Sequence, residues 1–195
     1  PITETLPTSA GITQTFINLV PFIHNRGPDY AQLLDAGTWS AFSSVLSLRA
    51  PFTPQPIVSR QAEDIEEGLK SLSICDKNSQ YILQFNGELY NADIKGNDTV
   101  FFTEQIRKYG VIEGIKRLEG EFAYVIHDLS KEQIYFGRDS VGKRSLVYKL
   151  DQESDDGLMI ASLSGKANNE GFTDCLAGVI YCYDVKERIL REEVF

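Results

Sequence analysis

Cysteine and histidine, which often act as nucleophiles, bases or metal ligands, are few in this chain. Its three cysteines are Cys75, Cys175 and Cys182, and no CxxC pair among them indicates a metal or redox site. The two histidines, His24 and His127, lie far apart and belong to no recognisable ligand spacing. We therefore expect buried or incidental thiols and no metal, and the sequence gives no support for a catalytic histidine.

Charged residues beside glycine-containing turns are a second group that could do chemistry. Arg26 and Asp29 belong to the segment RGPD, and Arg138 and Asp139 belong to GRD. Functional charges often lie on loops. An Arg–Asp pair at a tight turn, however, more commonly ties the loop to neighbouring carbonyl groups. We interpret both pairs as structural.

The bulk composition narrows the class of protein. A chain of 195 residues with 42% hydrophobic content fits a single domain, 1–195. Its 28 acidic and 19 basic residues give a charge of -9, which would repel phosphate backbones and anionic membrane surfaces. No apolar run approaches the roughly 20 residues that cross a bilayer, and the first residues do not resemble a signal peptide. We expect a soluble, cytoplasmic protein with no nucleic-acid or membrane partner.

Two further features concern the extent of the domain. The sequence opens at Pro1 without an initiator Met and stops at Phe195 inside a strand-like stretch, which is typical of an excerpt from a longer chain. Residues 61–77 are acidic and only weakly periodic, so we interpret them as an exposed insertion without chemistry.

The first half of the chain mixes helical and strand patterns. Residues 13–25 have apolar positions at helical spacing, although Pro21 should kink that helix or delay its start. Residues 39–48 are β-prone and are followed by a proline-rich loop. Residues 81–85 predict a compact strand that ends in a turn at Asn86-Gly87.

The second half begins with helices and continues with strands. Asp98 or Asn97 is expected to cap a helix that ends at Gly110, and a second short helix follows at 111–118. After Gly120, five short alternating segments separated by turn residues predict a β-meander. This order favours the α+β class over a doubly wound sheet. Two antiparallel sheets packed face to face, with helices on the outer faces, would bury the apolar side of every element.

Five short motifs then occur in one order: RGPD at 26–29, QP at 55–56, NGELYN at 86–91, ND at 97–98 and GRD at 137–139. This order and spacing resemble the N-terminal glutaminase domain of asparagine synthetases, a class II glutamine amidotransferase domain. The stretches VLSLRAPFTPQPI and FGRDSVGKRSL are similar to the branch called asparagine synthetase domain-containing proteins. The resemblance implies the N-terminal nucleophile hydrolase fold, a four-layer α-β-β-α sandwich.

Glutamine hydrolysis needs a nucleophile, a base and donors for the tetrahedral oxyanion. The resemblance implies a cysteine at the mature N-terminus, with its own α-amino group, of pKa roughly 8, as the base. None of the three cysteines is terminal, and Pro1 cannot replace a thiol. We therefore expect this chain to be inactive as it stands. An omitted Met-Cys-Gly segment is one explanation, and loss of the nucleophile is the other.

The resemblance also assigns roles to residues that are present. It places the oxyanion donors on the side-chain amide of Asn86 and the backbone N–H of Gly87. It places the acceptors for the substrate ammonium on Glu88 and Asp98, although Asp98 could instead serve only as a helix N-cap.

The substrate carboxylate is where this sequence departs from the resemblance. The arginine expected shortly before the QP motif aligns with Val45. Arg49, four residues later, could supply the guanidinium, but a strand alternates faces and the shift need not direct it correctly. Ser145 and Leu163 stand where the family tends to have proline and glutamate, which puts coupling to a further domain in doubt.

These assignments lead to two main hypotheses and one weaker one. The first is a glutaminase that passes ammonia to a downstream C-terminal synthetase domain for ATP-dependent asparagine synthesis, with ATP and Mg bound only there, no cofactor here, and a homodimer as a further expectation. The second is a catalytically silent scaffold or an amino-acid-binding regulatory domain. A generic α+β binding module does not explain the ordered motifs.

Overall fold

The computed structural model describes residues 12–60, 79–151, 157–165 and 171–194. The acidic segment 61–77 lies outside these residues. In the N-terminal half the elements are α1 (Gln14–His24), β1 (Tyr30–Asp35), β2 (Ser40–Val45), β3 (Ile57–Arg60), β4 (Ser79–Leu89), α2 (Asp98–Tyr109) and α3 (Val111–Lys116). They are followed by β5 (Gly120–Asp128), β6 (Gln133–Arg138), β7 (Val147–Leu150), β8 (Leu158–Ala161), β9 (Thr173–Asp174), β10 (Val179–Asp184) and β11 (Ile189–Val194). None of the described helices is long and apolar enough to cross a membrane.

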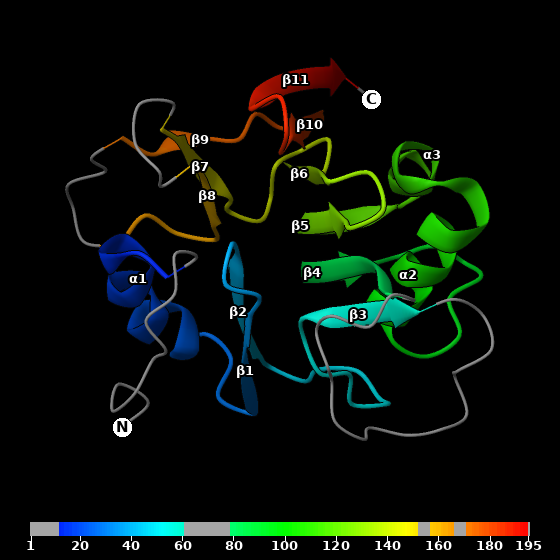
Figure 1. The fold of residues 1–195 in the computed structure, drawn as a ribbon. Helices are drawn as coiled ribbons and strands as arrows, with labels where there is room; N and C mark the ends of the chain where they lie inside the picture. The colour runs from blue at the N-terminus through cyan, green and yellow to red at the C-terminus, as the bar shows by residue number, and fades with distance from the viewer. Residues whose placement is uncertain (1–11, 61–78, 152–156, 166–170, 195) are drawn as a thin grey trace.

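The elements form the α-β-β-α sandwich that the family resemblance implied. One layer is a six-stranded antiparallel sheet in the order β11-β10-β6-β5-β4-β3. Figure 1 shows α2 and α3 on its outer side and α1 on the far side of the second β layer. Aromatic residues fill the space between the two β layers, where Phe136 stacks on Tyr181 at 5.0 Å and Tyr148 packs against both. The core therefore joins the layers as one unit.

The second β layer differs from a single continuous sheet. It consists of a two-stranded sheet, β1-β2, and a three-stranded sheet in the order β8-β7-β9. Strands β2 and β8 are consequently edge strands. Leu19 of α1 packs against Val147 and Ala161, so α1 covers the outer face of the three-stranded sheet.

The predicted β-meander is only partly correct. Strands β5 and β6 pair as neighbours, but β7 and β8 pair with each other in the second layer, and β10 returns to pair with β6. Pattern alone could not show this crossing, because a strand with one buried face looks the same in either sheet.

The predicted turn at Asn86-Gly87 is wrong, because β4 continues through both residues to Leu89. Gly87 lies opposite Phe122 of β5 in an unbroken register. A Cβ atom on Gly87 would lie 2.2 Å from the carbonyl oxygen of Glu121 and 2.6 Å from the Cα of Phe122. The glycine is therefore required for close approach of two strands and not for a turn.

The helix predictions are confirmed with two refinements. Helix α1 contains Pro21 and continues to His24, and Thr13 caps it by accepting from the N–H of Phe16 at 3.2 Å. Asn97 caps α2, because its Oδ1 accepts from the N–H of Thr99 at 2.8 Å. Asp98 is thus the first helical residue and not the cap.

The core between α2 and the six-stranded sheet offers a direct stability test. Phe102 is 0% exposed and packs edge-on against Phe85 at 5.9 Å and Tyr124 at 5.8 Å. We predict that Phe102→Ala lowers the free energy of unfolding by about 3–5 kcal/mol in urea titrations. Val100→Ala, at an exposed position of the same helix, should change it by about 0.5 kcal/mol or less. Equal effects would contradict this packing.

Candidate active site

The five residues expected to serve the site line one cavity of about 470 Å³ between the two β layers. Asn86, Gly87 and Glu88 come from β4, Asp98 comes from the start of α2, and Arg49 comes from the loop after β2. The fold thus brings together groups that lie up to 49 positions apart in the chain.

The backbone N–H of Gly87 points to the open edge of β4. The N–H of Tyr90 donates to the carbonyl oxygen of Glu119 at 2.7 Å, which fixes the alternation of the antiparallel ladder between β4 and β5. By that alternation, the N–H groups of Phe85, Gly87 and Leu89 all face away from β5.

Side chains occupy two of these three donors. The N–H of Phe85 donates to Gln55 Oε1 at 2.7 Å, and the N–H of Leu89 donates to Asp98 Oδ2 at 3.1 Å. Strand β3 cannot supply an acceptor for Gly87, because its pairing with β4 ends at Leu83. Within the part of the chain that the structure describes, the Gly87 N–H therefore lacks an acceptor and lies on the cavity wall.

Asn86 and Glu88 project from β4 on the face opposite the helices. Phe85 and Leu89 are buried in the core beneath α2, and side chains alternate along a strand, so their neighbours turn toward the second layer. Both are half-buried, and among the described residues the Asn86 amide has no hydrogen-bond partner. An amide group, a carboxylate and a free N–H thus adjoin on one strand.

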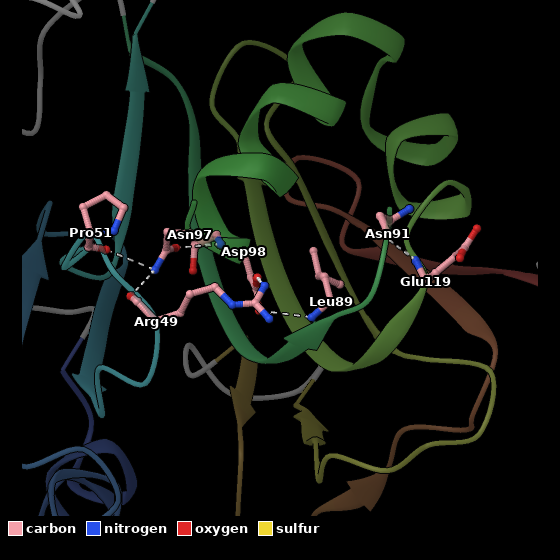
Figure 2. Close-up of polar contacts among 8 residues, drawn as sticks. Arg49, Pro51, Leu89, Asn91, Asn97, Asp98 and Glu119 are labelled. Carbon is pink, nitrogen blue, oxygen red and sulfur yellow. Dashed lines mark hydrogen bonds and ion pairs between the residues drawn. The ribbon is translucent and has the colours of Figure 1, made fainter. Parts of the chain in front are cut away.

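Asp98 and Arg49 form an ion pair at the edge of the cavity (Figure 2). The Arg49 guanidinium donates to Asp98 Oδ1, while Oδ2 accepts from the N–H of Leu89. The Nδ2 of Asn97 donates to the carbonyl oxygens of Arg49 and Pro51, each at 3.4 Å. The loop that carries Arg49 is therefore attached to the start of α2 by side-chain and main-chain contacts.

The position of the expected arginine has a different role here. Val45 is buried, pairs with Tyr30 and accepts from the N–H of Asp29 at 3.1 Å. Strand β2 ends at Val45, so strand alternation does not govern the direction of Arg49. The loop conformation directs Arg49 to the cavity, which the sequence alone could not decide.

The two described cysteines do not lie at this cavity. Burial raises the pKa of the Cys175 thiol to about 12, against a smaller opposing effect of Arg138. Burial also raises the pKa of Cys182 above its ordinary value. Cys75 lies outside the described residues. Neither described thiol has the electropositive, accessible surroundings that favour a nucleophilic thiolate.

The surroundings of His127 and of the possible metal ligands are also visible in the structure. His127 lines a second cavity and packs edge-on against Trp39 at 5.2 Å. Burial lowers the pKa of His127, while Asp128 and Glu132 act in the opposite direction. Among the described residues, no group of three or more His, Cys, Asp or Glu side chains could hold a metal ion.

The structural interpretation of the turn charges is confirmed for the GRD segment. Arg138 donates to the carbonyl oxygens of Arg144 at 2.6 Å, Cys175 at 2.9 Å and Gly142. Asp139 is 1% exposed and accepts from four backbone N–H groups, those of Phe122, Val141, Gly142 and Lys143. These bonds fix the passage from β6 to the second layer.

The RGPD segment is held in the same way. Arg26 donates to the carbonyl oxygen of Ser162 at 3.2 Å, although it also lines the cavity. Asp29 accepts from the N–H of Ser47 at 2.8 Å.

Sequence reasoning missed Arg144 and Gln84 as cavity residues. The Nε of Arg144 is buried and has no hydrogen-bond partner among the described residues, and its Nη2 lies 3.7 Å from Glu121 Oε1. Gln84 donates to Phe42 O at 3.0 Å and joins β4 to β2 across the layers. Only the position of Arg144 inside the segment FGRDSVGKRSL could have signalled it.

Comparison with known proteins identifies the family of this chain. The model of a family described as glutamine amidotransferase domain matches residues 58–167. The chain belongs to this family. An asparagine synthetase domain-containing protein of Saccharomyces cerevisiae is 41% identical over 184 residues, which is 90% of this chain and 31% of that protein. One of Gallus gallus is 28% identical over 78% of this chain and 23% of its own length. The match with this chain thus spans less than a third of the length of either relative.

The solved structures support the fold of the glutamine amidotransferase domain. Glutamine phosphoribosylpyrophosphate amidotransferase of B. subtilis has a TM-score of 0.50 and 17% identity, and the match covers 72% of this chain and 31% of that one. At that identity the likeness concerns the fold alone.

The buried aspartate of the GRD segment generates a prediction. Asp139→Asn replaces one acceptor oxygen with an NH₂ group that faces backbone donors. We expect it to lower the free energy of unfolding by about 1–3 kcal/mol. Asp29→Asn, where one exposed bond is affected, should cost less than about 1 kcal/mol in the same urea titrations. A harmless Asp139→Asn would contradict the four-bond arrangement.

Proposed function

We propose that the cavity binds glutamine and that the domain hydrolyses its side-chain amide to glutamate and ammonia. The observation that carries this proposal is the N–H of Gly87 beside the side-chain amide of Asn86 at the open edge of β4, both without a hydrogen-bond partner in the described parts of the chain. A backbone donor fixed by the strand and an adjacent side-chain amide donor suit the oxyanion of a tetrahedral intermediate. Each is worth roughly 3 kcal/mol of transition-state stabilisation when it is preorganised.

The charged residues of the cavity suit the other end of a free amino acid. Glu88 and Asp98 supply acceptors for an α-ammonium group, and Arg49 supplies a planar donor for an α-carboxylate. A cavity of about 470 Å³ accommodates a molecule of this size.

The edges of β2 and β8 support a place for the nucleophile. Ala36 N–H donates to Trp39 O at 3.0 Å, which by alternation turns the backbone groups of Phe42 away from β1. Asp151 N–H donates to Gly157 O at 2.9 Å, which likewise turns those of Ile160 away from β7.

Phe42 of β2 and Ile160 of β8 line both the first cavity and a second one of about 460 Å³. An extended segment lying between these strands would pair with both edges and complete the second β layer, sharing the Phe42 carbonyl oxygen with Gln84. In the proposed enzyme this segment ends at the N-terminal cysteine, beside Asn86.

The chemistry then follows the order of an acyl transfer. The α-amino group of the cysteine accepts the thiol proton, and the thiolate sulfur bonds to the amide carbon of glutamine. The carbon–nitrogen bond breaks, and ammonia leaves with the transferred proton. Water then cleaves the thioester to give glutamate and restores the thiol.

The fate of the ammonia is a further part of the proposal. Relatives named asparagine synthetase domain-containing proteins are about three times as long as this chain or longer. We infer that a C-terminal synthetase domain of the same protein uses the ammonia for ATP-dependent amidation of aspartate in the cytoplasm, with ATP and Mg bound there.

A second candidate function is a silent amino-acid-binding domain. It is favoured by the absence of a described thiol from the cavity wall and by Leu163, which packs in the cluster with Leu19. Under this alternative, glutamine would bind without releasing ammonia.

The oxyanion assignment gives the test. In the full-length protein with an intact N-terminal cysteine, we predict that Asn86→Ala lowers kcat for ammonia release about 100- to 1,000-fold with little change in KM. Asn18→Ala, at an exposed position of α1, should leave both constants unchanged. A full rate for Asn86→Ala would refute the assignment. Glutamine binding without any ammonia from the unmutated protein would establish the silent alternative.

A further inference from the structure

The Arg49–Asp98 ion pair closes the part of the cavity that would receive a charged ligand. Both residues line the cavity, and in the ligand-free protein the charge of each is paired with that of the other. A bound zwitterion competes with this contact, because its ammonium would pair with Asp98 and its carboxylate with Arg49. This argument rests on the proposed function, since glutamine is the zwitterion considered.

The two side chains of this ion pair differ in how firmly they are held. The Asp98 side chain is 10% exposed, and its Oδ2 is held by the N–H of Leu89. The Arg49 side chain is 43% exposed, while its carbonyl oxygen is anchored by Asn97. The guanidinium can therefore rotate away while its backbone and Asp98 stay in place.

We propose that this ion pair is a specificity device: glutamine exchanges one internal ion pair for two ligand ion pairs, and a ligand with only one charge cannot complete the exchange. An ammonium alone can contact Glu88, but it competes with Arg49 for Asp98 and displaces a guanidinium that no ligand carboxylate receives. A carboxylate alone draws Arg49 away and leaves the buried Asp98 charge unpaired, which is costly. The pair therefore selects free α-amino acids over simple amides.

Two truncated ligands separate these contributions. γ-Aminobutyramide is glutamine without its α-carboxylate, and glutaramate is glutamine without its α-ammonium. In calorimetry with the 195-residue chain, we predict that the affinity of each is at least about 30-fold lower than that of glutamine. In Arg49→Gln, glutamine should weaken, whereas γ-aminobutyramide should bind about tenfold more tightly than to the unmutated chain, because Asp98 no longer has an internal competitor.

The gain for γ-aminobutyramide is the readout that a merely structural role would not produce. If Arg49 only holds its loop, Arg49→Gln will weaken all three ligands together, and the proposal is overturned. Arg107→Gln, at an exposed position near the end of α2, is the control and should preserve the unmutated order. Failure of glutamine to bind the full-length protein in the same assay would instead overturn the proposed function itself.

Discussion

The geometry of the site depends on how β4 is paired. Its ladder with β5 runs uninterrupted from Tyr81 to Leu89, whereas its pairing with β3 ends at Leu83. The backbone donors beyond that point must find side-chain acceptors or remain available to a ligand. Gln55 and Asp98 satisfy the outer two, and the middle donor, at Gly87, remains. The same pairing turns Asn86 and Glu88 toward the second layer, so one strand supplies three of the groups that the proposed reaction needs.

Helix α2 adds the charged end of the site through its N-cap, Asn97, and its first residue, Asp98. Asn97 caps the helix and ties the loop of Arg49 to it, which leaves the Asp98 carboxylate to face the cavity. Sequence could not choose between these two residues as the cap, because both side chains suit the position. The consequence is functional: a carboxylate occupied in capping would have been less available for an ammonium group.

Much of the fold was predictable because helices and half-buried strands leave clear periodic patterns. The helix at 98–109, the strands after Gly120 and the α+β class followed from apolar spacing and turn residues, whereas the four-layer arrangement was implied by the family resemblance. The incorrect predictions concern features that are set by neighbouring strands and not by the local sequence. Asn-Gly is typical of a turn, but β5 offers nine residues of pairing, and Gly87 is needed where Glu121 approaches. The direction of Arg49 likewise depends on where β2 ends and not on its own position.

The central claim is that Gly87 keeps an unpaired N–H within a paired strand, and amide hydrogen exchange of the 195-residue chain tests it most directly. The account predicts slow exchange for Phe85 and Leu89, whose N–H groups have acceptors, and exchange at least about 100-fold faster for Gly87 between them. Protection of Gly87 equal to that of its two neighbours would show that its N–H already has a partner, and would contradict the assignment of an oxyanion donor at this position.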